Sequence, residues 1–117
     1  MVEIRRRGEV WVANLNPARG AEVGKVRPVL VIQADTLTEA GSDTVIILPL
    51  TSQLRPGLRR YRVPVSARDR LLKDCYVVVE KPRALDRKRF GEGPLTTLTP
   101  VEMAEVEKSL KAVTGMW

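Results

Sequence analysis

The chain has 117 residues and carries 20 Lys and Arg against 14 Asp and Glu, a formal net charge of +6. This length predicts a single domain over residues 1–117, and the basic balance favours nucleic acid or an acidic protein as a partner. The chain contains no histidine and one cysteine, Cys75. These counts exclude an internal disulfide, the common zinc ligand sets and an imidazole general base.

The amino terminus has basic residues at positions 5–7 but no apolar segment after them. This is not the pattern of a signal peptide, and no apolar run is long enough to span a bilayer. We therefore expect a cytoplasmic protein with no membrane contact, in which Cys75 is reduced and buried.

Apolar and β-branched runs between turn residues predict five strands. They cover residues 8–13, 29–32 (continuing towards 34), 44–48, 61–65 and 75–79. The runs at 29–32 and 44–48 are almost wholly apolar, which is typical of strands buried on both faces. Pro64 predicts that the fourth strand lies at a sheet edge. Polar connections are expected at residues 35–43, 55–60, 66–74, 80–86 and 87–94, with one short helical turn in 66–74.

The last element has the clearest boundaries. Thr99 is a typical N-cap, Pro100 suits the first helical position, and Glu102 completes a capping box. Gly115 is typical of a helix end. The apolar face, which packs on the core or on a second subunit, comprises Met103, Val106, Leu110 and Val113. Short strands, long polar loops and this helix predict a mainly β domain, a small, partly open β-barrel with a C-terminal helix.

The loop before the second strand holds opposite charges. It contains two glycines and Glu22, and Arg27 is its last predicted residue. Pro28 biases Arg27 towards extended geometry. An arginine at the start of a rigid strand presents a fork of donors to a phosphate or carboxylate, so we expect an anion site there.

Taken together, the segments resemble the MazF/PemK family of toxin endoribonucleases. The similarity runs in order through residues 7–12, 16–22, 24–33, 50–53 and 80–86 and covers nearly the whole chain. It implies an SH3-like barrel of the kind shared with CcdB gyrase poisons, acting as a homodimer. It also implies sequence-selective cleavage of single-stranded RNA without metal or cofactor, and neutralisation by a cognate, acidic, MazE-like antitoxin.

The resemblance assigns roles to particular residues. The family's catalytic arginine maps onto Arg27, its strand-end hydroxyl onto Thr51 and its loop glutamate onto Glu22. The residues expected to bind RNA are Lys25, Ser52, Gln53, Arg55, Arg59, Arg60, Glu80, Lys81 and Arg83. Many relatives carry Glu/Asp-Gln where this chain has Glu80-Lys81. If that glutamine contacts a base, the RNA sequence preference of this chain differs.

The chemistry fits these residues without the family name. RNA supplies its own nucleophile, the 2′-hydroxyl, so the protein has to align that group and stabilise charge on phosphorus. Arg27 suits the non-bridging oxygens, and the hydroxyl of Thr51 can hold the 2′-oxygen or a phosphate oxygen. Because arginine keeps its proton at all ordinary pH, we expect Glu22 rather than Arg27 to be the base.

Plainer interpretations exist for each residue. Glu22 and Arg27 could form only a loop ion pair, and residues 51–53 only a turn. The arginines at 55, 59, 60 and 62 could be a solvated loop instead of an RNA track. Trp11 and Tyr61 could stack on bases, although core packing is favoured for Trp11.

Two other functions are compatible with the same barrel. One is a CcdB-like poison of DNA gyrase, which the terminal Met116-Trp117 suggests because those relatives use a C-terminal tryptophan. The other is an RNA-binding barrel without catalysis.

Overall fold

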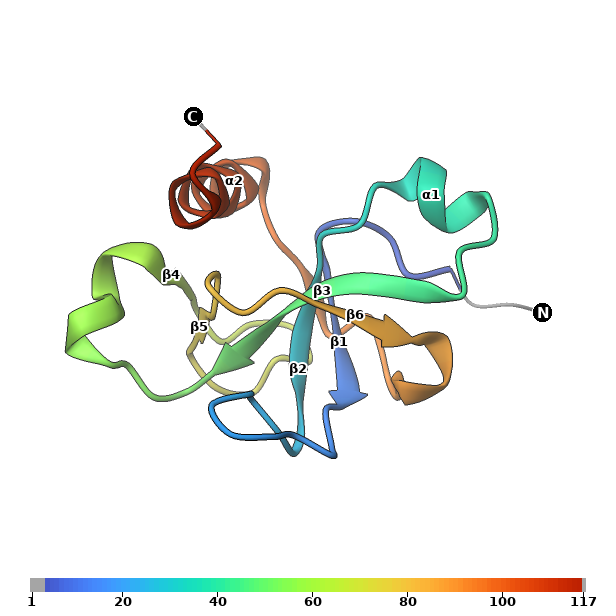
Figure 1. The fold of residues 1–117 in the computed structure, drawn as a ribbon, viewed down its shortest axis with the longest axis horizontal. Coiled ribbons are helices and arrows are strands. Elements are labelled where there is room, and N and C mark those ends of the chain that lie inside the picture. The colour runs from blue at the N-terminus through green and yellow to red at the C-terminus, as the bar shows by residue number, and fades with distance from the viewer. Residues whose placement is uncertain (1–3, 117) are drawn as a thin grey trace.

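The structure, a computed structural model, describes residues 4–116. An antiparallel sheet curls into a partly open barrel, and helix α2 lies against one side of it (Figure 1). In chain order the elements are β1 Glu9–Asn14, β2 Val26–Val31, α1 Asp35–Glu39, β3 Thr44–Thr51, the 3₁₀ helix η1 Pro56–Tyr61, β4 Val63–Val65, β5 Cys75–Val77, β6 Arg83–Asp86, the 3₁₀ helix η2 Arg87–Arg89, β7 Thr96–Thr97 and α2 Pro100–Thr114. Within the described residues, no helix has the length and apolar character needed to cross a membrane.

The long strand β3 joins the two halves of the sheet. The strand order is β4-β5-β3-β2-β1-β7, and β6 also pairs with β3. Residues 44–47 of β3 pair with β6, whereas Leu50 and Thr51 pair with β5. Its other side pairs with β2, with Val29 opposite Pro49. The two strands predicted to be fully apolar therefore form the centre of the sheet.

Both faces of the sheet are covered. One apolar cluster, between the sheet and α2, includes Leu30, Leu48 and Val106. The other, on the opposite face, includes Val29 and Trp11. Because successive residues of a strand point to opposite faces, Val29 and Leu30 enter different clusters, and both are fully buried. Burial of β2 on both faces is confirmed.

Several local predictions are also confirmed. Thr99 and Glu102 form the capping box, and Gly115 ends α2 in the left-handed region with φ 74°. β4, which contains Pro64, lies at the end of the strand order. Cys75 is buried, and Trp11 is buried with its Nε1 donating to Glu9 at 3.0 Å, so Trp11 packs in the core and is not a base platform.

The start of β2 was predicted wrongly. The strand begins at Val26 because the ladder with β1 extends to the pairs Ala13–Arg27 and Asn14–Val26. Arg27 is therefore a strand residue and not the last residue of the loop. β3 also runs three residues further than predicted, to Thr51.

The other differences concern short or polar segments. α1 occupies part of the expected connection 35–43, η1 part of 55–60, and residues 66–74 contain no helical turn. β6 and β7 were missed because β6 has only 4 residues, with a charged residue at each end, and β7 has only 2 residues. The pairing partners of β6, residues 44–47, are some 40 positions away in sequence, so no local sequence pattern predicts this strand.

Candidate active site

The adjacent ends of β2 and β3 bring a guanidinium and a hydroxyl together. The two strands pair with Val29 opposite Pro49. Continuing this register by two residues sets Arg27 opposite Thr51, and strand alternation puts both side chains on one face of the sheet. Both line the same two hollows at this end of the sheet. The structure thus brings together the two residues that the resemblance pairs.

Arg27 is oriented by a bond to the turn before it. Its Nε donates to the carbonyl oxygen of Gly24 at 2.8 Å, and the side chain is half-buried. A guanidinium has five N–H donors, so the donors on the two terminal nitrogens are left to meet an anion. The turn is close-packed, since a Cβ on Gly24 would lie 2.9 Å from the Cβ of Ala18. An arginine held in this way can present a fork to two phosphate oxygens.

Thr51 is the last residue of β3 and is held on the sheet by pairing with Tyr76 of β5. Its Oγ1 accepts from the backbone N–H of Gln53 at 3.2 Å. A hydroxyl has one proton to donate and two lone pairs, so this bond leaves the proton for a ligand oxygen. The strand end therefore presents a donor whose position is set by the sheet.

Glu22 lies in the β1–β2 loop, which we define as residues 15–25. Its backbone N–H donates to the carbonyl of Arg19 at 3.1 Å, and its Oε1 accepts from the backbone N–H of Arg19 at 2.7 Å. These two bonds close a tight turn over residues 19–22. Among the ion pairs of residues 4–116, none joins Glu22 to Arg27. The interpretation of the two residues as a simple loop ion pair is therefore wrong.

Two hollows meet at Arg27 and Thr51 and together form what we call the cleft. The larger has a volume of about 700 Å³ and the smaller about 170 Å³. The larger extends to residues 70–73, and the smaller includes Glu22 of the β1–β2 loop. Hollows of this order hold ligands of nucleotide size. Arg27, Thr51 and Glu22 are thus within one continuous depression, although Glu22 enters only its smaller part.

The residues predicted to bind RNA divide into two groups. Those that line the cleft are Lys25, Ser52, Gln53, Arg55 and Lys81. Those that do not are Arg59, Arg60, Glu80 and Arg83. The first group comes from three separate segments, and it gives the cleft a predominantly basic lining.

The basic residues of η1 lie elsewhere. The guanidinium of Arg60 is 4.8 Å from the ring centre of Tyr61 and donates to its hydroxyl at 2.6 Å. Arg60 and Tyr61 line a groove beside α2, and Arg59 is an exposed neighbour on η1. The expected track of loop arginines therefore splits, because the 3₁₀ helix turns Arg59 and Arg60 away from Arg55.

The carboxylate of Glu80 is hydrogen-bonded to the buried Arg62. The side chain of Arg62 is 4% exposed, and its Nη2 donates to Oε2 of Glu80 at 2.7 Å, with a longer bond of 3.4 Å from Nε to Oε1. Burial acts to raise the pKa of the Glu80 carboxyl, but the hydrogen bonds from Arg62 and the backbone outweigh it and hold the pKa below its usual value. Glu80 therefore stays charged and neutralises Arg62 beneath the cleft.

One wall of the cleft was missed by the sequence analysis. Arg70, Leu72 and Lys73, in the segment that we call the 66–74 loop, line the larger hollow. Leu72 is 87% exposed although it is apolar. The segment was described only as polar and basic, and no local signal places it opposite β2 and β3. Its position depends on the β4–β5 pairing at its two ends.

A charged network fastens the 66–74 loop to the start of α2. Both terminal nitrogens of Arg68 donate to Glu102, at 2.8 and 2.5 Å, and Glu102 also closes the capping box. Thr96 accepts from Arg68 at 3.3 Å and donates to Asp69 at 2.7 Å. The hydrogen bonds from Arg68 lower the pKa of the Glu102 carboxyl. The cleft wall is thus tied to the helix through side chains.

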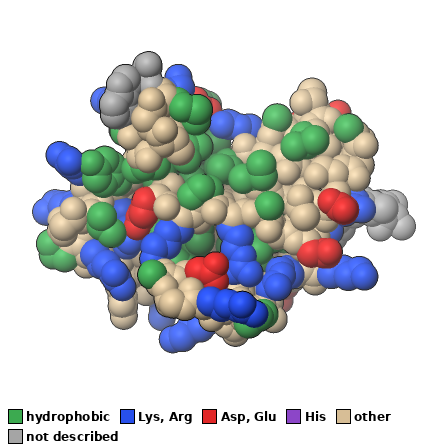
Figure 2. Space-filling model, in the orientation of Figure 1, with side chains coloured by type: hydrophobic (Ala, Val, Ile, Leu, Met, Phe, Trp, Pro, Cys, Tyr) green, Lys and Arg blue, Asp and Glu red, His purple; other side chains and the backbone are tan. Residues whose placement is uncertain are grey.

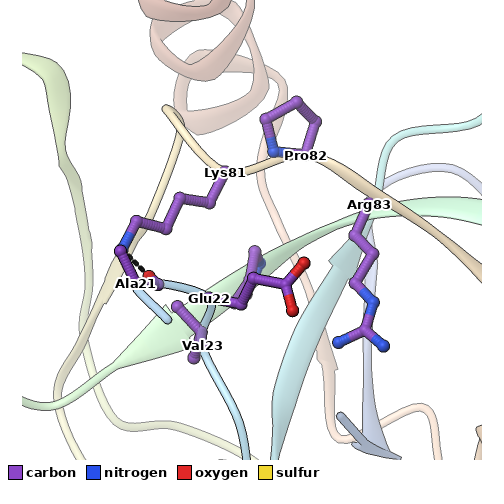
Figure 3. A pocket seen from close by; sticks show the side chains of 7 residues that line it. Ala21, Glu22, Val23, Lys81, Pro82 and Arg83 are labelled. Carbon is purple, nitrogen blue, oxygen red and sulfur yellow. Dashed lines mark hydrogen bonds between the residues drawn. The ribbon is translucent and has the colours of Figure 1, made fainter. Parts of the chain in front are cut away.

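The β1–β2 loop is fastened in another way. Arg83 donates to the carbonyl of Leu15 at 2.8 Å, Arg89 donates to the carbonyl of Asn14 at 3.2 Å, and Lys81 donates to the carbonyl of Ala21 at 2.5 Å. These three side chains all come from residues 81–89, and each donates a hydrogen bond to a main-chain carbonyl oxygen. Figure 3 shows Lys81 reaching across to Ala21, with the carboxylate of Glu22 and the guanidinium of Arg83 pointing into the hollow between them.

The surface around the cleft is basic. In Figure 2, Lys and Arg side chains gather over the lower half of the view, where the β1–β2 loop lies, and hydrophobic side chains gather nearer α2. In the described part of the chain, acidic residues and Cys75 form no cluster that could hold a metal ion. The arrangement can bind a polyanion and place one anionic group between a guanidinium and a hydroxyl.

Comparison with known proteins agrees with this geometry. The family described as PemK-like, MazF-like toxin of type II toxin-antitoxin system matches residues 6–114. A curated endoribonuclease MazF of Staphylococcus epidermidis is 37% identical over 116 residues, covering 95% of this chain and 92% of the relative.

Solved structures share the fold at lower identity. The crystal structure of MazF from Deinococcus radiodurans superposes with a TM-score of 0.83 at 23% identity and covers 98% of this chain and 100% of that one. A mycobacterial endoribonuclease in complex with its cognate antitoxin gives a TM-score of 0.75 at 19% identity and covers 99% and 98% of the two chains. By sequence and by fold, this chain belongs to the PemK-like, MazF-like toxins of type II toxin–antitoxin systems.

Proposed function

We propose that this toxin is an endoribonuclease that cleaves single-stranded RNA at the cleft between β2 and β3. The observation that carries the proposal is the meeting of Arg27 and Thr51, from adjacent strand ends, in one basic cleft. Family membership and the curated endoribonuclease relative support the same activity.

In the proposed reaction the 2′-hydroxyl next to the scissile phosphate attacks phosphorus. The bond from phosphorus to the 5′-oxygen breaks, and that oxygen takes a proton from solvent water, which leaves a 2′,3′-cyclic phosphate and a 5′-hydroxyl. Arg27 stabilises the charge on the non-bridging oxygens, and the hydroxyl of Thr51 donates to one oxygen of the phosphate or holds the 2′-oxygen. A solvated carboxylate such as Glu22, which is exposed and at the edge of the smaller hollow, takes the proton from the 2′-hydroxyl.

We assign selectivity for the RNA sequence to the groups that flank Arg27 and Thr51. Lys25, Ser52 and Gln53 on one side and Lys81 on the other are positioned to contact nucleotides next to the scissile phosphate. The basic rim also suits an acidic antitoxin, as in the relative solved with its cognate antitoxin. We include in the proposal a homodimer acting in the cytoplasm, where transcripts are available.

Cleavage of a long transcript in excess EDTA tests the proposal. We expect cuts at a short recurring sequence, with cyclic-phosphate and 5′-hydroxyl ends, and no cut where the nucleotide 5′ to the scissile phosphate is a deoxynucleotide. Thr51→Ala should lower kcat by about tenfold to a hundredfold. Arg27→Lys should lower it more, because the charge is kept but the fork is lost.

Near-wild-type cleavage by Arg27→Lys would overturn the role of the guanidinium fork. Inhibited DNA supercoiling with intact RNA would instead favour the gyrase-directed alternative. That alternative depends on Trp117, which lies outside the described residues.

A further inference from the structure

The contact between Lys81 and the β1–β2 loop suggests a role that binding alone does not explain. Lys81 follows β5, and its ammonium donates to the carbonyl of Ala21, 60 positions earlier in the chain, at 2.5 Å. The side chain is half-buried. It lines both the smaller hollow of the cleft and the adjoining hollow of about 350 Å³ in Figure 3. Lys81 therefore links the segment after β5 to the β1–β2 loop at the edge of the cleft.

The bonded carbonyl belongs to the turn that carries Glu22. Residues 19–22 are closed by the two hydrogen bonds between Arg19 and Glu22, so Ala21 and Glu22 move as one unit. A bond to Ala21 consequently restrains the carboxylate of the next residue.

Except for the packing of Val23, the other contacts of the loop lie at its base. The N–H of Leu15 donates to the carbonyl of Lys25 at 2.8 Å, and the N–H of Lys25 donates to Asn16 at 2.9 Å. Val23 packs against the apolar cluster on this face. Among the hydrogen bonds of residues 4–116, the one from Lys81 is the bond that ties residues 17–23 to another part of the chain. Its loss should free the turn while the base of the loop stays closed.

We infer that Lys81 is a positioning residue that holds the turn 19–22, and with it Glu22, at the edge of the smaller hollow, which Arg27 and Thr51 also line. This inference rests on the proposed function, in which Glu22 accepts a proton. Misplacing a proton acceptor by about 1 Å costs up to a hundredfold in rate. An ammonium that only bound a phosphate would act on substrate affinity instead.

The test compares Lys81→Met, Lys81→Arg and Glu22→Gln, the double variant Lys81→Met/Glu22→Gln and the control Lys111→Met. Lys111 is an exposed lysine on α2, outside the cleft. The substrate is a short single-stranded RNA that contains one mapped cut. We expect Lys81→Met to lower kcat about tenfold with KM within about twofold, Lys81→Arg to recover most of this loss, and Lys111→Met to behave as wild type. Lys81→Met should change kcat little when Glu22 is already Gln.

Three results would overturn the inference. The first is a higher KM with an unchanged kcat for Lys81→Met, which is the signature of lost binding. The second is a double variant whose loss is the product of the two single losses, because Lys81 would then act independently of Glu22. The third is full activity of Glu22→Gln, since Glu22 would then need no positioning.

A readout without RNA separates this inference from the proposed function. Hydrogen exchange of the backbone amides at residues 18–24 should be faster in Lys81→Met than in Lys111→Met, with the amides of β1 and β2 unchanged. If the wild-type protein cuts no RNA, the proposed function fails, and exchange still reports whether Lys81 restrains the turn. Equal exchange in both variants would contradict the restraint itself.

Discussion

The two walls of the cleft are held in place by opposite strategies. The 66–74 loop is tied through side chains, with Arg68 bonded to Glu102 of α2 and Asp69 bonded to Thr96 of β7. The β1–β2 loop is tied through its own main chain, since Arg83 and Lys81 donate to its carbonyl oxygens.

This difference determines which substitutions would loosen each wall. In the 66–74 loop the backbone N–H of Arg70 donates to the carbonyl of Leu95, but the charged anchors are the loop's own side chains, so changes at Arg68 or Asp69 should loosen the wall. In the β1–β2 loop the hydrogen bonds come from side chains of residues 81–89, so Glu22 does not anchor the loop to the rest of the domain and needs only Oε1 to close its own turn. This wall is thus held by donors from another segment, and the opposite wall is held by its own charged side chains.

Arg68→Met should have the largest effect on stability. The substitution keeps the aliphatic stem but removes both bonds to Glu102, whose side chain is 21% exposed. We expect a loss of about 2 kcal/mol in the free energy of unfolding, measured by urea denaturation. Arg70→Met is the matched control, because the Arg70–Glu92 pair is exposed at 56% and 74% and its loss should cost less than about 0.5 kcal/mol. Equal losses for the two variants would show that the bonds from Arg68 to Glu102 do not hold this wall.

Gly24→Ala should affect the other wall more in activity than in stability. The new Cβ would lie 2.9 Å from the Cβ of Ala18 and 3.0 Å from Oδ1 of Asn16, so the turn that accepts from Arg27 has to shift. We expect about 1 kcal/mol lost in stability and at least about tenfold in kcat. Gly57→Ala, where a Cβ meets nothing within 4 Å, is the control and should change neither quantity measurably.

The contact between the 66–74 loop and α2 should also be sensitive to acid. Hydrogen bonds from Arg68 lower the pKa of Glu102 below 4.5, so the unfolded chain binds a proton there more readily than the folded one. The stabilisation from this pair is complete above pH 4.5 and is lost as pH falls through the lowered pKa. Unfolding measured between pH 7 and pH 3 should be less acid-sensitive in Arg68→Met than in wild type. An identical pH dependence of unfolding in the two proteins would show that the Arg68–Glu102 pair does not cause the acid sensitivity.

Leu72→Ser should have the smallest effect on stability. The side chain is 87% exposed on the rim of the larger hollow, so the free energy of unfolding should change by less than about 0.5 kcal/mol. KM for RNA should rise a few-fold with kcat unchanged, because an apolar contact to substrate is lost. The neighbouring Leu71 is 3% exposed, and Leu71→Ser should be strongly destabilising. A changed kcat for Leu72→Ser would place this wall in the chemistry and not only in binding.

The sequence predicted those parts of the molecule that local patterns determine. The central strands were predicted from their almost wholly apolar runs, and α2 was predicted from its capping box. Both signals lie in residues that are close together in the sequence. The pairing of Arg27 with Thr51 came from the family resemblance, and strand register is its structural basis.

The parts that were missed depend on contacts between distant segments. β6 pairs with residues 44–47, and the 66–74 loop becomes a cleft wall through the β4–β5 pairing at its ends and its bonds to Glu102 of α2. Arg59 and Arg60 were placed in one basic track with Arg55 because a linear sequence does not reveal that η1 reorients them. Nor did any pattern indicate that Glu80 would neutralise the buried Arg62.

The position of Thr51 at the end of β3 has a consequence for how such a toxin is controlled. β3 contributes to both apolar clusters and pairs with β2, β5 and β6, so local fluctuations cannot detach its last residue without melting the whole domain. We therefore expect a neutralising protein to leave Thr51 in place and to act by covering the cleft or by shifting the β1–β2 loop. When such a partner dissociates, the hydroxyl needs no refolding of β3 to regain its position.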